Sequence, residues 1–226
     1  MLYIYLDTNI IKLMHLKKSI LGQYEASFYK KTLQVPLLEK GKPANPDIMA
    51  SGIKEVLAKL PEGSSKDRDV TLVLPQETFI FMKTEMPPDM AEGVLGTYLK
   101  DKARTETTFD AESGHYGYIV KENEGSKKII FYGASNGVVD AFATPLKLIE
   151  LNLACIVPES LTYFNLFEKT LRANKKETIW YVSYDQDELS GYVYDSFGLI
   201  EDSKWKASLG TTKKIEKVLQ KKVAEF

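Results

Sequence analysis

The stretch from Val70 to Met90 constrains the fold more than any other part of the sequence. It opens with a short apolar run, Val70–Leu74, which is typical of a strand buried on both faces. Pro75 ends this strand because proline lacks the amide hydrogen that would continue the ladder. A second β-prone run, Thr78–Met82, follows, and a helical pattern begins near Met90. The stretch therefore predicts a core strand whose end leads into a separate, inserted subdomain.

Composition limits the class of protein. The 226 residues are enough for one large domain or two small ones. A net charge of -1 argues against a dedicated nucleic-acid binder, which would carry a basic surplus. The lone Cys155 and the two histidines, His15 and His115, are too few for a disulfide or a cysteine- or histidine-built metal site. With no apolar run long enough to span a membrane and no signal-peptide pattern, we expect a cytoplasmic protein.

The first seventy residues predict the element order β-β-β-α-β. Three β-prone segments, Met1–Leu6, Ile10–Leu16 and Gln23–Leu33, are spaced as in an antiparallel meander. Asn45 is a good helix cap and Pro46 fits the first helical position. The helix that they begin leads to the strand at Val70.

The remaining segments continue this α/β pattern. We expect a hairpin (116–120 and 128–132), a helix from Asn136 that Pro145 kinks or shortens, a strand (153–157), a helix from Pro158, two strands (178–182 and 189–194) and a last helix (212–223). The last helix is expected to bury Ile215, Val218, Leu219 and Val223.

Together these features resemble one family. The β-β-β-α-β order, the Gly-x-Pro-x-Asn-Pro entry at 41–46 and the Val-Thr-Leu-Val-Leu-Pro-Gln segment with its later Met-Pro are similar to PilM, the actin-like protein of type IV pilus assembly. The same architecture occurs in FtsA and, without nucleotide chemistry, in the cytoplasmic part of the type II secretion protein GspL. The resemblance covers roughly residues 1 to 220.

The resemblance implies a fold class and a division of the chain. The expected fold is α/β, actin-like (ribonuclease H-like), with an inserted α+β subdomain and a truncated or reduced second domain. The first subdomain would comprise 1–74 and 136–175, the inserted subdomain 75–135, and the start of the second domain 176–226.

Two turns depart from the pattern of an actin-like ATPase, whose glycines let the backbone approach the phosphates. The first turn, Asp7–Lys12, contains no glycine, and the second, Tyr184–Gly191, carries three carboxylates and no basic residue. The resemblance therefore implies degenerate phosphate loops, at Asp7, Thr8, Asn9, Lys12, Asp185, Ser190 and Gly191. We expect no catalysis, no bound metal and no cofactor. A Mg²⁺ ion bridging the carboxylates leaves ATP binding, as in a functional actin-like protein, as the alternative.

Other interpretations remain open for the same residues. Asp7 and Asn9 are turn formers in their own right. The segment Tyr5–Ile11 also resembles the opening of PIN-domain ribonucleases, whose first Asp holds a divalent metal, and Asp140 could supply a helical acid. That family begins β-α and carries a late Thr-x-Asp, which this sequence lacks after its strand at 153–157.

The resemblance implies a scaffold of a pilus or secretion platform at the inner membrane, not an enzyme. Its partner would be a short cytoplasmic segment of a membrane protein, held between the first and the inserted subdomain, and a secretion ATPase is a further possible partner. We expect Phe79 and Phe81 to supply apolar contacts there. The alternative is that both faces of their strand are buried within this chain. The basic residues of the last helix are either its solvent face or a contact with an anionic leaflet: Lys213, Lys214, Lys217, Lys221 and Lys222. The protein would then be peripheral to the inner membrane.

Overall fold

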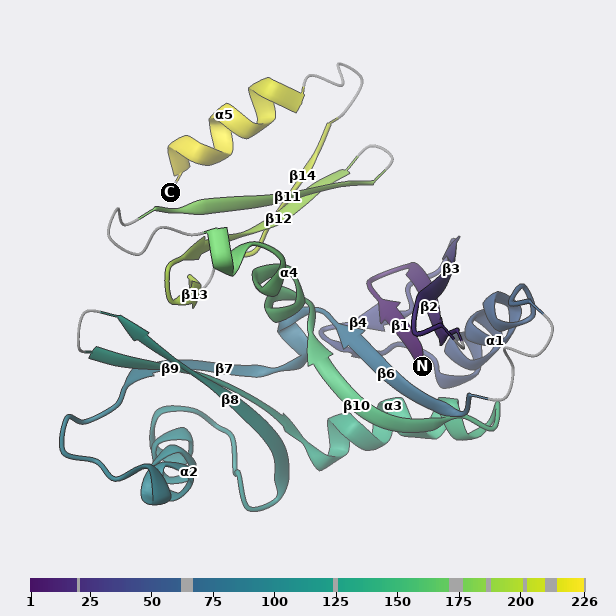
Figure 1. The fold of residues 1–226 in the computed structure, drawn as a ribbon. Helices are drawn as coiled ribbons and strands as arrows, with labels where there is room; N and C mark the ends of the chain where they lie inside the picture. The colour runs from purple at the N-terminus through teal and green to yellow at the C-terminus, as the bar shows by residue number, and fades with distance from the viewer. Residues whose placement is uncertain are drawn as a thin grey trace.

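A computed structural model describes residues 1–19, 21–61, 67–123, 126–170, 177–185, 188–200, 203–209 and 215–225. Figure 1 shows three sheets arranged around helix α4. Within the described residues no helix is long and apolar enough to cross a membrane.

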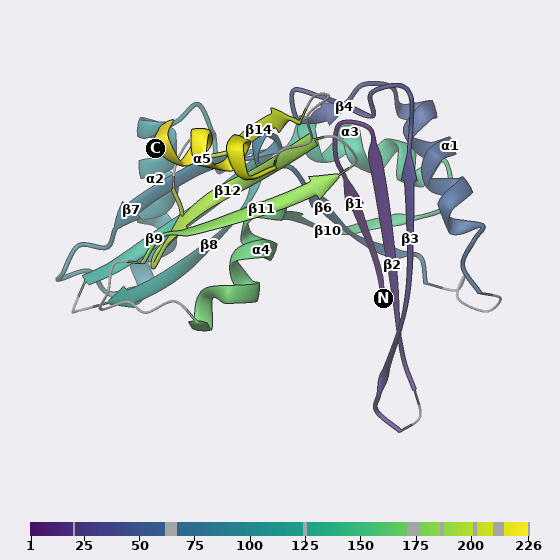
Figure 2. The ribbon, with the colours of Figure 1, turned by 90° about the horizontal axis from the view of Figure 1, so that it is seen from above.

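The core sheet has five strands in the order β10-β6-β1-β2-β3. Strands β1 (Leu2–Leu6), β2 (Ile10–Lys18) and β3 (Tyr24–Thr32) form the predicted antiparallel meander, while β6 (Asp69–Leu74) and β10 (Asn152–Pro158) run parallel to β1. The β2–β3 hairpin projects beyond the rest of the molecule (Figure 2). The third strand contradicts the β-α opening that the ribonuclease alternative requires.

Helices α1 (Pro46–Leu57) and α3 (Asn136–Lys147) pack on one face of the core sheet. The side chain of Asn45 caps α1 as predicted, accepting from the backbone N–H groups of Asp47 at 2.9 Å and Ile48 at 3.1 Å. Helix α3 runs without interruption, so Pro145 does not shorten its first half. Proline in the last turn removes only one intrahelical hydrogen bond near an end that frays in any case. Two short strands of two residues each, β4 (Leu38–Glu39) and β5 (Lys42–Pro43), form an antiparallel pair before α1.

The inserted unit follows Pro75 and contains a three-stranded antiparallel sheet in the order β7-β9-β8. Its strands are β7 (Ile80–Glu85), β8 (Gly114–Asn123) and β9 (Ser126–Ser135), and helix α2 (Leu95–Glu106) packs on one face. The expected strand at Thr78–Met82 is shifted, because Gln76–Thr78 form the short 3₁₀ turn η2 after Pro75. The helix expected near Met90 likewise begins later, after the 3₁₀ turn η3 (Glu92–Val94).

The second unit is built on β11 (Ile179–Asp185) and β12 (Glu188–Asp195), the two strands expected across the acidic turn. Two further strands, β13 (Gly198–Leu199) and β14 (Trp205–Ser208), pair with opposite ends of β12. Helix α4 (Glu159–Phe167), followed by the 3₁₀ turn η4 (Glu168–Thr170), joins this unit to the core sheet through Phe164.

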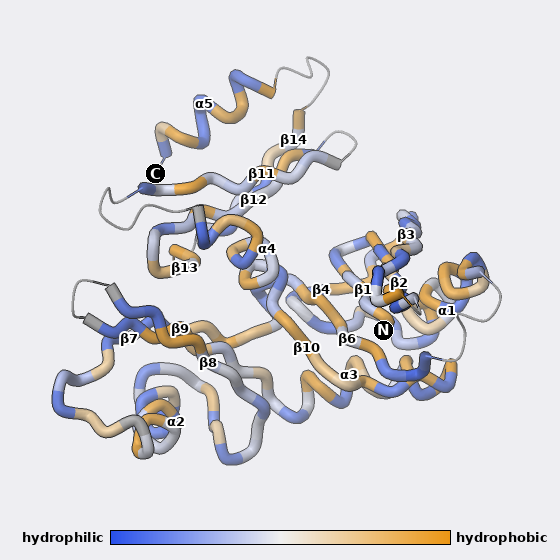
Figure 3. Tube along the Cα trace, in the orientation of Figure 1, coloured by the Kyte–Doolittle hydropathy of each residue, from blue (hydrophilic) through white to orange (hydrophobic). Residues whose placement is uncertain are grey.

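The last helix, α5 (Ile215–Glu225), buries less than expected. Val218 and Leu219 pack partly against the second unit, but Ile215 is 38% exposed and Val223 is 55% exposed. Hydrophobic and hydrophilic residues alternate along this helix (Figure 3). Only the side that carries Val218 and Leu219 is partly buried, and no residue of the helix is fully buried. The prediction that all four apolar residues are buried was therefore wrong.

Candidate functional site

The residues predicted as degenerate phosphate loops meet at one cleft between the core sheet and the second unit. Asp7 comes from the β1–β2 turn, Lys12 from β2, and Ser190 and Gly191 from β12. Thr8 lies beside them, and its Oγ1 is 3.5 Å from Lys206 Nζ.

The remaining predicted residues are Asn9 and Asp185. Asn9 faces away, with its side-chain amide donating to the carbonyl of Leu33 at 3.4 Å, as a turn former does. Asp185 ends β11 opposite Glu188. Gln186 and Asp187, which complete the acidic turn, lie outside the described residues.

Gly191 has a packing role at this position. A Cβ built on it would lie 2.0 Å from the Tyr181 carbonyl oxygen and 3.1 Å from the ring of Trp205. The strand is therefore held against its neighbours at the point where a phosphate loop would need open backbone.

A buried carboxylate, Glu159, occupies the centre of the cleft. It is the first residue of α4 and is 4% exposed. The Tyr5 hydroxyl donates to it at 2.8 Å, and the Tyr192 hydroxyl also donates to it. Lys204 Nζ lies 3.9 Å away. Because Tyr5 belongs to the core sheet and Tyr192 to the second unit, this carboxylate joins the two.

Burial controls the titration of this cluster. It raises the pKa of Glu159 above its ordinary value, although the hydrogen bonds from the tyrosines and the charge of Lys204 act against it. Burial, followed by the nearby charge of Glu159, raises the pKa of Tyr5 and of Tyr192. The two hydroxyls therefore stay protonated and act as donors.

Sequence reasoning missed the cluster of Tyr5, Glu159, Tyr192 and Lys204. The available signal was weak: a charged residue directly after the proline that ends an apolar strand.

The cleft is small. Its volume is about 40 Å³, which accommodates only a few water molecules, whereas small-molecule sites span roughly 300–1,000 Å³. The stacked rings of Tyr163 and Tyr181, with centroids 3.9 Å apart, also line it. No group of three potential metal ligands occurs among the residues that the structure describes. In this geometry the cleft does not fit a nucleotide.

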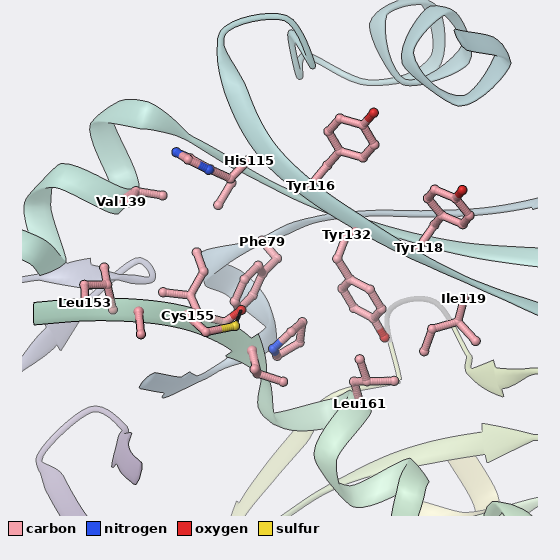
Figure 4. Close-up of a pocket in the computed structure, with 16 residues that line it drawn as sticks. Phe79, His115, Tyr116, Tyr118, Ile119, Tyr132, Val139, Leu153, Cys155 and Leu161 are labelled. Atoms are coloured by element: carbon pink, nitrogen blue, oxygen red, sulfur yellow. Dashed lines mark hydrogen bonds between the residues drawn. The ribbon is translucent and has the colours of Figure 1, made fainter. Parts of the chain in front are cut away.

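A larger, apolar groove lies between the inserted unit and the core sheet (Figure 4), where the resemblance placed a partner. Its volume is about 470 Å³. Strand β8 contributes one wall, including His115 and Ile119, and β10 contributes the other, including Leu153 and Cys155. The register of β10 shifts between Leu153 and Cys155, and such a bulge re-aims the side chains beside it.

Two rings from the inserted unit point into the groove. Phe79 and Tyr132 meet edge to face, with centroids 6.4 Å apart (Figure 4). Burial raises the pKa of Tyr132 to about 12, so its hydroxyl is neutral and can donate.

Both walls of the groove are edge strands. Among the described residues β8 pairs only with β9, and β10 pairs only with β6. Each wall therefore has backbone groups that its own sheet does not use. This combination of free edges and apolar side chains suits an extended peptide.

Phe81, the second residue expected at the partner site, does not line this groove. Its ring packs against the cluster of Phe164, Tyr192, Tyr194 and Leu199 in α4 and the second unit. Phe81 lies on the same side of the chain as Phe79, and its ring also meets Tyr132 edge to face with centroids 5.4 Å apart. The contacts with α4 and the second unit therefore cover this half-buried side chain in part.

The comparisons with known proteins bear on the fold. No family model and no curated protein matches the sequence. Among solved structures, the chain is similar to the PilM-PilN type IV pilus biogenesis complex, with a TM-score of 0.67 and 14% identity over 97% of this chain and 65% of that one. The chain has the actin-like fold. This chain spans 65% of the length of the chain that it matches in the PilM-PilN complex.

A second similarity agrees with the first. The cytoplasmic domain of EpsL, an inner membrane component of the type II secretion system of Vibrio cholerae, matches with a TM-score of 0.53 and 14% identity over 92% of this chain and 70% of that one. At these identities the similarity shows the fold and leaves the activity to be argued from the site.

Proposed function

We propose that this actin-like chain is a scaffold of a type IV pilus or type II secretion assembly platform and holds an extended segment of an inner-membrane partner. The observation that carries the proposal is the apolar groove between the free edges of β8 and β10. An extended segment that enters it adds a strand to either edge, and its backbone hydrogen bonds supply affinity.

The lining of the groove sets the chemistry of the segment. Alternate side chains of an added strand point to opposite sides, so every second residue faces the rings of Phe79 and Tyr132. Those positions are apolar in the proposed partner. Its polar positions alternate with these and point away from the two rings.

The similar structures support this assignment. One is a complex of PilM with PilN in type IV pilus biogenesis, and the other is an inner membrane component of a secretion system. By this analogy the chain acts on the cytoplasmic side, peripheral to the inner membrane, and a secretion ATPase is a further candidate partner. Lys217, Lys221 and Lys222 of α5 are candidates for contact with an anionic leaflet, whereas Lys213 and Lys214 lie outside the described residues.

We infer that the nucleotide site is degenerate and that the chain is not an enzyme. The small cleft, the packed Gly191 and the Glu159 cluster support this inference. The alternative is a functional actin-like ATP-binding protein, for which the second unit would have to separate from the core sheet and break the Tyr192–Glu159 hydrogen bond.

The test is a binding measurement with labelled synthetic peptides that cover the cytoplasmic segments of the inner-membrane proteins of the same system. Gly117 lies on a groove wall, and a Cβ there meets nothing within 4 Å, so Gly117→Arg fills the groove without disturbing the fold. Gly93 in η3 is equally open and lies outside the groove, so Gly93→Arg is the matched control.

We expect fluorescence anisotropy to show one apolar peptide that binds the wild type and Gly93→Arg but not Gly117→Arg. Equal binding to both variants, or no binding by any peptide of the set, would contradict the proposal.

A further inference from the structure

The opposite edge of the core sheet carries an unusual strand. Strand β3 is the last in the order β10-β6-β1-β2-β3, and among the described residues it pairs only with β2. Natural edge strands are normally short, bulged or covered. This one has nine residues in unbroken register, and Tyr24 and Phe28 on it are 55% and 60% exposed.

The hydrogen bonds at the two ends of the hairpin fix which backbone groups of β3 are free. The N–H of Ser19 donates to the Gln23 carbonyl at 2.7 Å, and the N–H of Leu33 donates to the Asn9 carbonyl at 2.8 Å. Hydrogen-bonded pairs alternate along an antiparallel ladder. The odd-numbered residues of β3 therefore bond to β2, and the even-numbered ones direct both backbone groups outward.

Those outward groups can satisfy a second copy of the same strand. If two β3 strands run antiparallel about a twofold axis beside Phe28, Phe28 pairs with Phe28 of the other copy, Ala26 with Lys30, and Tyr24 with Thr32. Each of these pairs joins even-numbered residues, so every outward donor meets an outward acceptor. Such a self-complementary contact is the mark of an isologous dimer.

Charge fixes the same register. In it Glu25 of each copy lies opposite Lys31 of the other, on the face where Lys31 already pairs with Glu55 of α1. Within one chain Glu25 lies opposite Lys17. Lys17, Glu25 and Lys31 of the other copy then form a row of alternating charge across the contact. A shift of two residues in either direction places Glu25 opposite Tyr29 or Leu33 and removes the match.

The open face supplies the apolar contact. Tyr3 lies opposite Met14, and Met14 opposite Phe28, in consecutive strands. The dimer extends this row through the second Phe28 to Met14 and Tyr3 of the other copy. Paired aromatic side chains on neighbouring strands stabilise a sheet beyond the area that they bury.

We propose that two copies of this chain associate through β3 and join their five-stranded core sheets into one continuous sheet. The contact uses the edge opposite to β10, so it leaves the groove between β8 and β10 open on both copies. This inference is independent of the proposed function, and its test uses no peptide.

The test is sedimentation velocity of the whole chain over a wide range of concentrations. Ala26→Pro removes an outward N–H and adds a ring at the contact, while the bonds to β2 remain, because proline is tolerated where the N–H side of an edge strand faces solvent. Phe28→Lys places two like charges side by side. Tyr184→Lys, at a residue of β11 that is 55% exposed, is the matched control.

We expect the wild type and Tyr184→Lys to form a dimer whose population rises with concentration. Ala26→Pro is expected to be monomeric with an unchanged unfolding midpoint, and Phe28→Lys to weaken the dimer about tenfold or more. Glu25→Lys weakens it as well, and adding Lys31→Glu restores it.

Two results would overturn the inference. One is a wild-type chain that stays monomeric at every concentration. The other is a dimer that tolerates both Ala26→Pro and Phe28→Lys, since its contact would then lie elsewhere.

Discussion

At the scale of a single residue, Glu159 occupies the centre of the small cleft between the core sheet and the second unit. Its carboxylate accepts hydrogen bonds from Tyr5 and Tyr192, one from each side. A buried carboxylate is stable only with such partners, and removing one leaves the others unsatisfied. The cluster therefore holds the core sheet and the second unit together.

The raised pKa of Glu159 predicts a pH dependence of stability. Below its ordinary pKa of 4.5 the carboxyl is protonated in both the folded and the unfolded chain. As the pH rises toward the raised folded pKa, the unfolded chain loses this proton first, and the folded state loses stability. Glu159→Gln, which cannot ionise, is expected to lack this loss.

Urea unfolding of the wild type and Glu159→Gln from pH 4.5 upward checks this expectation. The difference in unfolding free energy should move in favour of the variant as the pH rises and then level off. Parallel profiles for the two proteins would show that the folded and unfolded pKa values are equal.

Gly191 gives a second prediction at this scale. Gly191→Ala places a methyl group against the Tyr181 carbonyl, so β11 and β12 must separate, and we expect a loss of about 2 kcal/mol in unfolding free energy. Gly117→Ala in β8 meets open space and is expected to change it by less than about 0.5 kcal/mol. Urea denaturation of both variants makes the comparison. A tolerated Gly191→Ala would mean that this backbone is free to move.

At the scale of elements, strands β7 and β8 are expected to play different roles, the first in packing and the second in partner binding. Phe81 packs on α4 and the second unit, while His115 of β8 is exposed at the groove. The sequence of β7 is apolar on both faces, and this pattern alone does not show what covers the second face. The structure shows a cover within the same chain.

Phe81→Ala is therefore expected to cost about 3 kcal/mol of stability and to leave peptide binding by the folded protein intact. His115→Ala should do the reverse, with a small change in stability and weaker binding. Denaturant unfolding and anisotropy titration of both variants test the pair. A binding loss in a fully folded Phe81→Ala would return this residue to the partner site.

Most elements of the core sheet could be predicted because their signals are local. Alternating or continuous apolar runs mark β1, β2 and β6, and the side-chain cap of Asn45 marks the start of α1. Strand β14 and the burial of α5 could not be predicted in this way. Trp205 is buried only because β14 pairs with a distant part of β12, and the exposure of Ile215 depends on which neighbours reach it.

The same distinction between local signals and long-range contacts applies to the candidate site. Asp7 and Gly191 were named from the family resemblance and both line the small cleft, whereas Glu159 and the β8–β10 groove depend on contacts between residues far apart in sequence. No local pattern shows that two edge strands from different sheets will face each other.

At the scale of the whole molecule, the three larger sheets lie around one helix, α4, and the cleft around Glu159 is small while the groove between β8 and β10 is open. We expect a calorimetric titration with ATP and Mg²⁺ to show no binding or only weak binding, because opening the cleft exposes the Glu159 cluster. Micromolar affinity for ATP would contradict this and favour the actin-like ATPase alternative.

The central claim, that a partner segment occupies the groove, can be tested at one atom. Cys155 is the single cysteine of the chain, is exposed, and lies on the β10 wall. Its rate of alkylation should fall as the bound peptide saturates the wild type, with the same midpoint as the anisotropy titration, and should not respond to the peptide in Gly117→Arg. A peptide that binds the wild type and leaves the alkylation rate of Cys155 unchanged would place the partner site outside the groove.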